Sequence, residues 1–350
     1  MGSVKNLTVL KAPTKSQSGR GRFYFSDRYS VFDWGEMPDH INQKGAALCI
    51  TAAYFFELLK KEGIFTHYLG LVEAGETKKL SQINHPVKVL ETILFRVLTP
   101  EFNEKEGYDY SIYQQEKNNY LIPLEVIYRN SLPHGSSVFG RLKNGQLTLE
   151  DFGINQMPSQ GELLKKPFLD VSTKLEASDR YLNWQEAQNI SNLSEHKIAE
   201  IKFLTKRINH IITKTVHQVG LENEDGKFEF ALDQDQNLIL VDVFGTLDEC
   251  RFTYQGIPVS KEIARLYYRQ SQWYQEICQA KEKSYSHWKD LIRRNPEPLP
   301  PRLKLLISRV YCAFTNEVTG KEWFKDIPTL QETLDEIKIF FIDVQNINRY

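Results

Sequence analysis

The chain has 350 residues, of which 41% are hydrophobic and 25% charged, as expected for a folded protein with two lobes around one cleft. Forty-four basic residues nearly balance 45 acidic ones, so the charge does not indicate binding to nucleic acid or to a membrane surface. We find neither a membrane span of roughly 18 apolar residues nor the apolar core of a secretory signal. We therefore expect a cytoplasmic protein that acts on small polar molecules and could form a homo-oligomer.

The N-terminal third of the sequence predicts a sheet with one helix. Residues 7–13 and 22–35 are rich in aromatic and β-branched residues and flank the loop TKSQSGRG, which predicts a hairpin with a flexible tip. Helical spacing follows at 46–63, with further strand-like stretches at 66–72, 85–102 and 118–132. A polar, Tyr-rich connection at 103–119 separates the last two. We expect this sheet to be mainly antiparallel.

The remainder predicts a mixed second lobe and a helical tail. Residues 145–186 are polar and look too irregular for a strand or a long helix, whereas 194–219 form an amphipathic helix capped by Ser194. A hairpin at 226–252 and helices at 260–284 and 301–320 follow. The interpretation is an α+β fold with an N-terminal lobe (1–122), a larger α+β lobe (123–293) and a C-terminal helical extension (294–350).

The hairpin at 226–252 carries a carboxylate in each strand where an apolar residue would be expected, Glu229 and Asp242. If the turn uses the four residues 234–237, the two acids face each other with Cβ atoms about 4.5 to 5.5 Å apart. Such a like-charged pair is destabilising unless a cation lies between them, and Mg²⁺ suits two carboxylates together with substrate phosphates. A five-residue turn would break the pairing, and solvated acids on an exposed hairpin face remain the alternative.

Further charges lie close to this hairpin in the sequence. Lys227 shares the face of Glu229, and Asp248 and Arg251 follow the second strand. Arginine is suited to bidentate binding of carboxylate or phosphate. The loop TKSQSGRG could cover phosphates with its backbone N–H groups, although Gly/Ser-rich loops are more often plain turns.

Five ordered motifs between about residues 20 and 270 carry a family resemblance. They are DRYSVFDWGEMPDHINQKGAAL, FFELLKKEGIFTHYLG, IPLEVIYRN with GSS soon after, PFLDVSTKLEASD, and KFEF…LVDV…TLDECRF. Together they resemble SAICAR synthetase, the phosphoribosylaminoimidazole-succinocarboxamide synthase of purine biosynthesis, as a divergent branch. The resemblance implies a two-lobed α+β fold with an ATP cleft in the N-terminal lobe. It also implies an ATP-dependent ligase that joins the carboxylate of carboxyaminoimidazole ribotide (CAIR) to L-aspartate, giving SAICAR, ADP and phosphate.

The resemblance also implies roles for particular residues, with ATP and Mg²⁺ as cofactors. The metal ligands would be Glu229 and Asp242. The catalytic residues would be Lys227, Arg129, Arg251 and Asp248. ATP would bind at Lys11, Gly19, Gly21, Glu125 and Lys227. The substrates CAIR and L-aspartate would bind at Asp33, Lys44, Arg129, Ser136, Lys174, Asp179 and Arg251.

The sequence departs from the family pattern at a few positions, and these keep alternatives open. Ala231, Val243, Leu247 and Cys250 stand where the family usually has Gly, Glu, Pro and Ser. The first strand shows no clear phosphate-binding motif, so Lys11, Lys15, Arg20 and Arg22 are all candidates. A related amide-forming ligase with another acid or amine is one alternative. A nucleotide-binding relative without ligase activity is the other, and the retained Glu229 and Asp242 argue against it.

Overall fold

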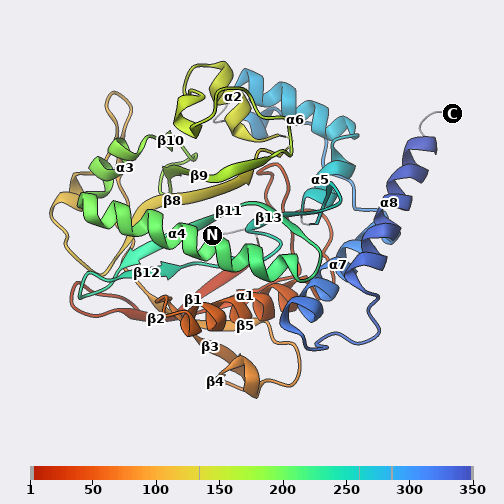
Figure 1. Ribbon diagram of the computed structural model, residues 1–350, viewed down its shortest axis with the longest axis horizontal. Coiled ribbons are helices and arrows are strands. Elements are labelled where there is room, and N and C mark those ends of the chain that lie inside the picture. Colours follow the sequence, from red (N-terminus) through yellow and green to blue (C-terminus); the bar gives the residue numbers. More distant parts are fainter. Residues whose placement is uncertain (1–3, 134, 260, 285–286, 348–350) are drawn as a thin grey trace.

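The computed structural model describes residues 4–133, 135–259, 261–284 and 287–347. Its first sheet has five antiparallel strands in the order β1-β2-β5-β3-β4 (Figure 1). These strands are β1 (Lys5–Lys11), β2 (Gly19–Phe25), β3 (Tyr68–Glu73), β4 (Glu76–Lys78) and β5 (Val89–Leu94). Helix α1 (Lys44–Lys61) packs against β2, β3 and β5. The predicted N-terminal hairpin, helix and antiparallel sheet are confirmed.

The second sheet has seven strands and forms the centre of the molecule. Its order is β10-β9-β8-β11-β13-β14, with β12 paired to the end of β11. The strands are β8 (Tyr120–Ser131), β9 (Leu163–Thr173), β10 (Tyr181–Leu182), β11 (Glu222–Leu232), β12 (Leu238–Val241), β13 (Cys250–Tyr254) and β14 (Ile257–Pro258). Because β8 starts at Tyr120, the expected lobe boundary at 122–123 falls inside this strand.

Helix α4 (Glu195–His217) packs on β8 and β11 and crosses in front of them in Figure 1. It begins as predicted, because the Ser194 side chain accepts a hydrogen bond from the backbone N–H of Lys197. The shorter helices of this region are α2 (Ser137–Lys143) and α3 (Trp184–Ser191). Together the two sheets and their helices confirm the α+β class.

The expectation of irregular structure throughout 145–186 is wrong, because β9 is an eleven-residue strand. The strand was hard to recognise because its first half, LLKKPFL, is largely exposed and only Asp170–Thr173 is fully buried. Strand β10 pairs with β9 only at Val171 and Ser172. Most of β9 therefore lies at the sheet edge, where Pro167 is tolerated.

The C-terminal part is helical, as predicted, with one correction. Residues 260–284 do not form one helix but two, α5 (Glu262–Tyr268) and α6 (Gln272–Lys283), because Ser271 caps a new helix by accepting from the N–H of Tyr274. Helices α7 (Pro301–Thr319) and α8 (Leu330–Ile347) follow. The 310 helices are η1 (Leu80–Gln82), η2 (Ser111–Gln114), η3 (Glu150–Phe152) and η4 (Trp288–Leu291).

The Tyr-rich connection at 103–119 lies mainly in a small hairpin of β6 (Glu101–Asn103) and β7 (Gly107–Asp109), followed by η2. The hairpin is an insertion between the two sheets in chain order. Among the described residues, no helix combines the length and the apolar character needed to cross a membrane.

Candidate active site

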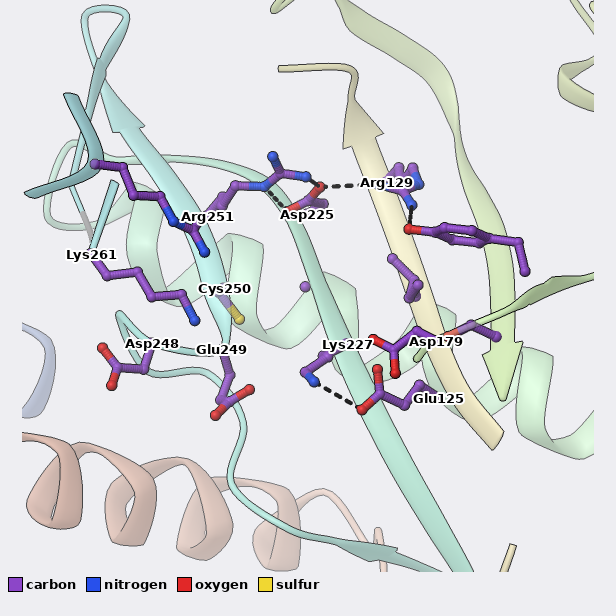
Figure 2. Close-up of a pocket in the computed structure, with 15 residues that line it drawn as sticks. Glu125, Arg129, Asp179, Asp225, Lys227, Asp248, Glu249, Cys250, Arg251 and Lys261 are labelled. Atoms are coloured by element: carbon purple, nitrogen blue, oxygen red, sulfur yellow. Dashed lines mark hydrogen bonds and ion pairs between the residues drawn. The ribbon is translucent and has the colours of Figure 1, made fainter. Parts of the chain in front are cut away.

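A cavity of about 240 Å³ opens on the second sheet, between β8, β11, β13 and α5 (Figure 2). The residues that line it include six predicted site residues: Glu125, Arg129, Asp179, Lys227, Asp248 and Arg251. Strand register accounts for much of this convergence. Arg129 on β8 pairs with Asp225 on β11, and Asp225 pairs with Arg251 on β13, so the three form a row across the sheet.

One end of the cavity is an arginine cluster of Arg129, Arg141, Arg251, Asp170 and Asp225. Arg129 Nη2 lies 3.0 Å from Asp170 Oδ2 and its Nη1 lies 3.4 Å from Asp225 Oδ2. Arg251 Nε donates to Asp225 Oδ1 at 2.7 Å, and Arg141 Nη1 donates to Asp170 Oδ2 at 2.6 Å. Three guanidinium groups therefore share two carboxylates. The remaining positive charge favours a bound anion here.

Beside the cavity lies a carboxylate cluster of Glu125, Glu229 and Asp242, together with Lys5, Lys174 and Lys227. Glu125 and Lys227 line the cavity, whereas the predicted metal ligands Glu229 and Asp242 do not. Lys174 Nζ bridges two of the acids, at 2.9 Å from Glu125 Oε1 and 2.7 Å from Glu229 Oε1. Lys227 Nζ donates to Glu125 Oε1 at 2.9 Å. Lys5 forms an ion pair with Asp242. Each acid thus has a lysine partner in this structure.

The predicted cross-strand pairing of Glu229 with Asp242 is wrong. Glu229 pairs with Val241 on β12 and with Glu125 on β8, and Asp242 follows the end of β12 with a φ of 59°. The turn spans five residues, 233–237, because Asp233 Oδ1 accepts hydrogen bonds from the N–H groups of Asp235 and Asn237. The like-charged cross-strand pair is therefore Glu229 with Glu125.

The acids nevertheless interact electrostatically. Burial, and then the negative charge of Asp242, raise the pKa of Glu229 to about 8. Burial acts in the same direction on Asp242, but the ammonium of Lys5 outweighs it and lowers the pKa of that carboxyl. Despite burial, the charges of Glu229 and Glu125 raise the pKa of Lys174. Burial and the neighbouring carboxylates thus both disfavour the ionised form of Glu229 in this cluster.

The donor set fits Mg²⁺. Mg²⁺ is usually bound by one or two carboxylates and completes its octahedron with water and phosphate oxygens. In the described ranges, no group of three or more His, Cys, Asp or Glu residues is placed to hold a metal ion. Glu229 is buried and Asp242 half-buried, and two carboxylates match the smaller requirement of Mg²⁺ with a bound nucleotide.

The predicted nucleotide residues near the N-terminus lie apart from the 240 Å³ cavity. Lys11 lines a second cavity of about 470 Å³, between the loop after β1 and the 233–237 turn. A Cβ on Gly19 would lie 2.5 Å from Lys11 O, and a Cβ on Gly21 would lie 2.7 Å from Leu94 Cδ1. Both glycines therefore have a packing reason to be small. Their contact with ATP stays a prediction.

Four predicted substrate residues do not line the 240 Å³ cavity: Lys174, which lies in the carboxylate cluster, and three that lie apart from both clusters. Asp33 is exposed and pairs with Lys281 at 2.9 Å. Ser136 is the N-cap of α2, where its side chain accepts from the N–H of Val138. Lys44 is buried, and its Nζ lies 2.5 Å from Asp248 Oδ2. The structure thus brings the sheet residues together and leaves these three around them.

The amino-acid sequence matches the SAICAR synthetase family over residues 13–283. A relative from Archaeoglobus fulgidus, provisionally named phosphoribosylaminoimidazole-succinocarboxamide synthase, is 48% identical over 97% of this chain and 99% of its own. The chain belongs to the SAICAR synthetase family. The phosphoribosylaminoimidazole-succinocarboxamide synthase of Thermoplasma acidophilum is 31% identical over 86% of this chain and 93% of its own.

Solved structures of SAICAR synthetases share the fold. The Saccharomyces cerevisiae SAICAR synthase, in complex with SAICAR, superposes with a TM-score of 0.64 at 19% identity, covering 92% of this chain and 94% of its own. A SAICAR synthetase in complex with ADP gives a TM-score of 0.54 at 20% identity, covering 85% and 99%. The two-lobed family fold expected from the sequence is confirmed.

Most departures from the family pattern lie in the core. Ala231, Val243 and Leu247 are buried and do not line the 240 Å³ cavity. Cys250 does line it, and its Sγ lies 3.4 Å from the hydroxyl of Tyr128. Of these four departures from the SAICAR synthetase pattern, Cys250 is therefore the one in the wall of the 240 Å³ cavity.

Sequence reasoning missed three cations that the structure places in the candidate site. The glycine-rich tip of the N-terminal hairpin suggested phosphate binding, and Lys5 lies outside that tip. In the structure, the start of β1 is the part of the hairpin that reaches Asp242. Lys261 and Arg265 line the cavity from the start of α5. They are four residues apart, a spacing that places both on one helix face, and this was the available signal.

Proposed function

We propose that this protein is a SAICAR synthetase that uses ATP to join the carboxylate of CAIR to the amine of L-aspartate. Family membership and the 48% identical relative support this activity. The observation that carries it is the arrangement along β11. Asp225, Lys227 and Glu229 alternate along the strand, so their side chains point to the same face. One strand thus connects the arginine cluster to the carboxylate cluster, over about 13 Å at the usual rise per residue.

The chemistry requires this arrangement of charges. A carboxylate is a poor electrophile at neutral pH, because the leaving group would be oxide. When a CAIR carboxylate oxygen attacks the γ-phosphorus of ATP, ADP leaves and an acyl phosphate forms. The aspartate amine then attacks the acyl carbon, phosphate leaves and the amine loses a proton. Positioning and charge neutralisation supply most of the catalysis of such a phosphoryl transfer.

We assign the arginine cluster and the carboxylate cluster, the two ends of the candidate site, accordingly. Arg129 and Arg251 bind an anionic group of CAIR, since their cluster has one more cation than carboxylates. Glu229 and Asp242 hold Mg²⁺, which when bound neutralises phosphate charge. Lys227, between the two ends, neutralises the transferring phosphoryl group. Lys174 and Asp179, on either side of the β9–β10 turn, contact CAIR or aspartate.

A related ligase with a different acid or amine is the second candidate, favoured by Cys250 in the cavity wall. One experiment separates the two. The protein is supplied with CAIR, Mg·ATP and one of L-aspartate, L-glutamate, L-asparagine or L-alanine, and ADP release and product mass are measured. A site built for two carboxylates should prefer aspartate in kcat/KM by about a hundredfold or more. ADP release and an amide product with another amine, but none with aspartate, would reject the named function.

ATP and CAIR are the proposed small-molecule partners, and Mg²⁺ the proposed metal. The cytoplasmic location and the possible homo-oligomer stay predictions from the sequence. Size-exclusion chromatography with light scattering measures the second directly.

A further inference from the structure

Helix α7 lies beyond residues 13–283, the part that matches the family, yet it packs against α1 beside the active site (Figure 1). Ser308, Tyr311 and Thr315 are three and four residues apart, so they share one face of α7. Ser308 Oγ donates to Asn42 O at 2.6 Å, and Thr315 Oγ1 donates to Ala47 O at 3.2 Å. This face of α7 is therefore fixed by hydrogen bonds at and just before the first turns of α1.

Tyr311, between these two contacts, reaches a residue of the cavity wall. Its hydroxyl donates to Asp248 Oδ1 at 2.6 Å, and Lys44 Nζ donates to Asp248 Oδ2 at 2.5 Å. The Lys44 ammonium also lies 5.3 Å from the centroid of the Tyr311 ring. All three side chains are buried. The carboxylate of Asp248 is thus held by one partner from α1 and one from α7.

This anchor acts on a segment that lacks a strand of its own. Residues 242–249 connect β12 to β13 and contain no regular strand or helix. Asp248 is near the end of that connection, and Asp248, Glu249 and Arg251 all line the cavity (Figure 2). Arg251 then reaches Asp225 in the arginine cluster. The position of the Asp248 side chain therefore influences where the cavity-lining groups after it lie.

We propose that Tyr311 is a positioning residue, which through its hydrogen bond to Asp248 holds the Asp248–Arg251 segment in its catalytically competent place. The helical extension therefore completes the active site of this chain, rather than only adding to its core. The turnover part of the test rests on the proposed SAICAR synthetase function.

Removing the Tyr311 hydroxyl while keeping the ring isolates this contact. In Tyr311→Phe, Asp248 Oδ1 loses its partner in a buried environment, and the carboxylate is free to rotate about Lys44. Hydrogen bonds to charged groups are strong, so we expect kcat for SAICAR formation to fall by about tenfold to a hundredfold. Thr315→Val is the matched control, because it removes a buried hydroxyl from the next turn of the same face without touching Asp248.

Turnover is measured at a temperature where both variants and the parent protein are fully folded by circular dichroism. A tenfold or larger loss of kcat in Tyr311→Phe, with nearly full activity in Thr315→Val, supports the proposal. Equal activities in the two variants overturn it. The Asp248→Asn background gives a second check, since Tyr311→Phe should add little loss there if the hydroxyl acts through Asp248. Additive losses would contradict that route.

A substrate-free measurement separates this inference from the proposed function. Amide hydrogen exchange of the peptide covering 245–251 should be faster in Tyr311→Phe than in the parent protein or in Thr315→Val. Unchanged exchange in Tyr311→Phe overturns the positioning role. If the parent protein makes no SAICAR, the proposed function fails, and this exchange comparison decides the role of Tyr311 alone.

Discussion

The arginine cluster and the carboxylate cluster, the two ends of the candidate active site, hold their charges in different ways. In the arginine cluster, Arg129 and Arg251 come from neighbouring positions across paired strands, and Asp225 lies between them in register. In the carboxylate cluster, the counter-charges are lysines, and two of them do not lie on strands of the second sheet. Lys5 begins β1 of the other sheet, and Lys174 follows the end of β9.

The difference suits what each end is proposed to bind. Arginine offers a planar, rigid set of donors that the sheet can aim in advance at a carboxylate or phosphate. Lysine carries a point charge on a flexible side chain. Lys5 and Lys174 can therefore break their ion pairs with these carboxylates when another cation binds. We infer that the arginine end is preformed, whereas the carboxylate end rearranges on binding Mg·ATP.

The largest expected effect comes from removing a proposed metal ligand. Glu229→Gln should lower SAICAR turnover by more than about a hundredfold, because one of two proposed protein ligands is lost. Steady-state kinetics with a Mg²⁺ titration measures this. Glu76→Gln is the control, since Glu76 is an exposed acid on β4. Normal turnover and Mg²⁺ dependence in Glu229→Gln would remove the metal assignment.

Arg129→Lys tests the preformed end. Lysine cannot reproduce the bidentate geometry, and a charge-assisted contact is worth roughly 1.5 to 3 kcal/mol, so the CAIR KM should rise about tenfold or more. Because Arg129 is buried against Asp170 and Asp225, we expect a lower melting temperature as well. Arg302→Lys, at an exposed pair on α7, serves as the control. A loss of stability with an unchanged CAIR KM would mean that Arg129 has a packing role only.

The pH dependence of stability tests the carboxylate end without substrate. The pKa of Glu229 is raised by burial and by Asp242 to about 8, above its unfolded value of 4.5. Between these values the unfolded state binds fewer protons, so stability falls as pH rises from about 5 to 8. Glu229→Gln should flatten this slope. Glu224, whose pKa burial raises to about 7, contributes in the same window and leaves a residual slope.

Thermal unfolding of the parent protein and of Glu229→Gln, measured at intervals across that range, gives the two slopes. The lowered pKa of Asp242 has the opposite effect, because it makes stability rise with pH. This effect is confined to pH values below about 4 and so does not overlap the range in which Glu229 titrates. Equal slopes of stability against pH in the two proteins would mean that folding does not raise the pKa of Glu229.

The smallest effect is expected from the insertion between the two sheets. The Tyr110 hydroxyl donates to Glu176 Oε1 at 2.9 Å, and the Tyr108 hydroxyl accepts from the N–H of Ala177 at 2.8 Å. Both contacts hold the turn that follows Lys174. Tyr110→Phe should therefore raise the KM for CAIR or L-aspartate, which this turn is proposed to contact, by about two- to tenfold and leave the KM for Mg·ATP unchanged. An equal rise in the KM for Mg·ATP would contradict this assignment of the turn.

Residue patterns predicted the parts of the site that follow from strand alternation. Lys227 and Glu229 share a face because they are two residues apart, and that needs no knowledge of the turn. The partner of Glu229 depended on turn length, and the side chain of Asp233 lengthened the turn by one residue. A one-residue change in register exchanges the faces of every side chain in a strand.

Contacts between distant elements were less accessible. Nothing near Lys5 indicates that it meets Asp242, because the two are 237 residues apart, with Lys5 in the first sheet and Asp242 in the connection after β12 of the second. Lys44 was recognised through its motif and expected at the substrate; in the structure it is buried and pairs with Asp248 of the cavity wall, and its contact with substrate stays a prediction. The sequence indicates which side chains carry chemistry, and the fold determines which of them share a neighbour.

The insertion leaves the first sheet after β5 and enters the second sheet at β8, and these two points lie close together. Leu121 N donates to Arg96 O at 2.8 Å, and Arg96 N donates to Asn119 O at 3.2 Å, so the two ends of residues 97–118 are hydrogen-bonded neighbours. The hairpin tip at 104–106 is exposed. A fluorescent reporter domain whose two termini lie close together could be inserted at this tip with little strain on the sheets. Because Tyr108 and Tyr110 contact the turn after Lys174, its emission would report the binding of CAIR or L-aspartate proposed for that turn.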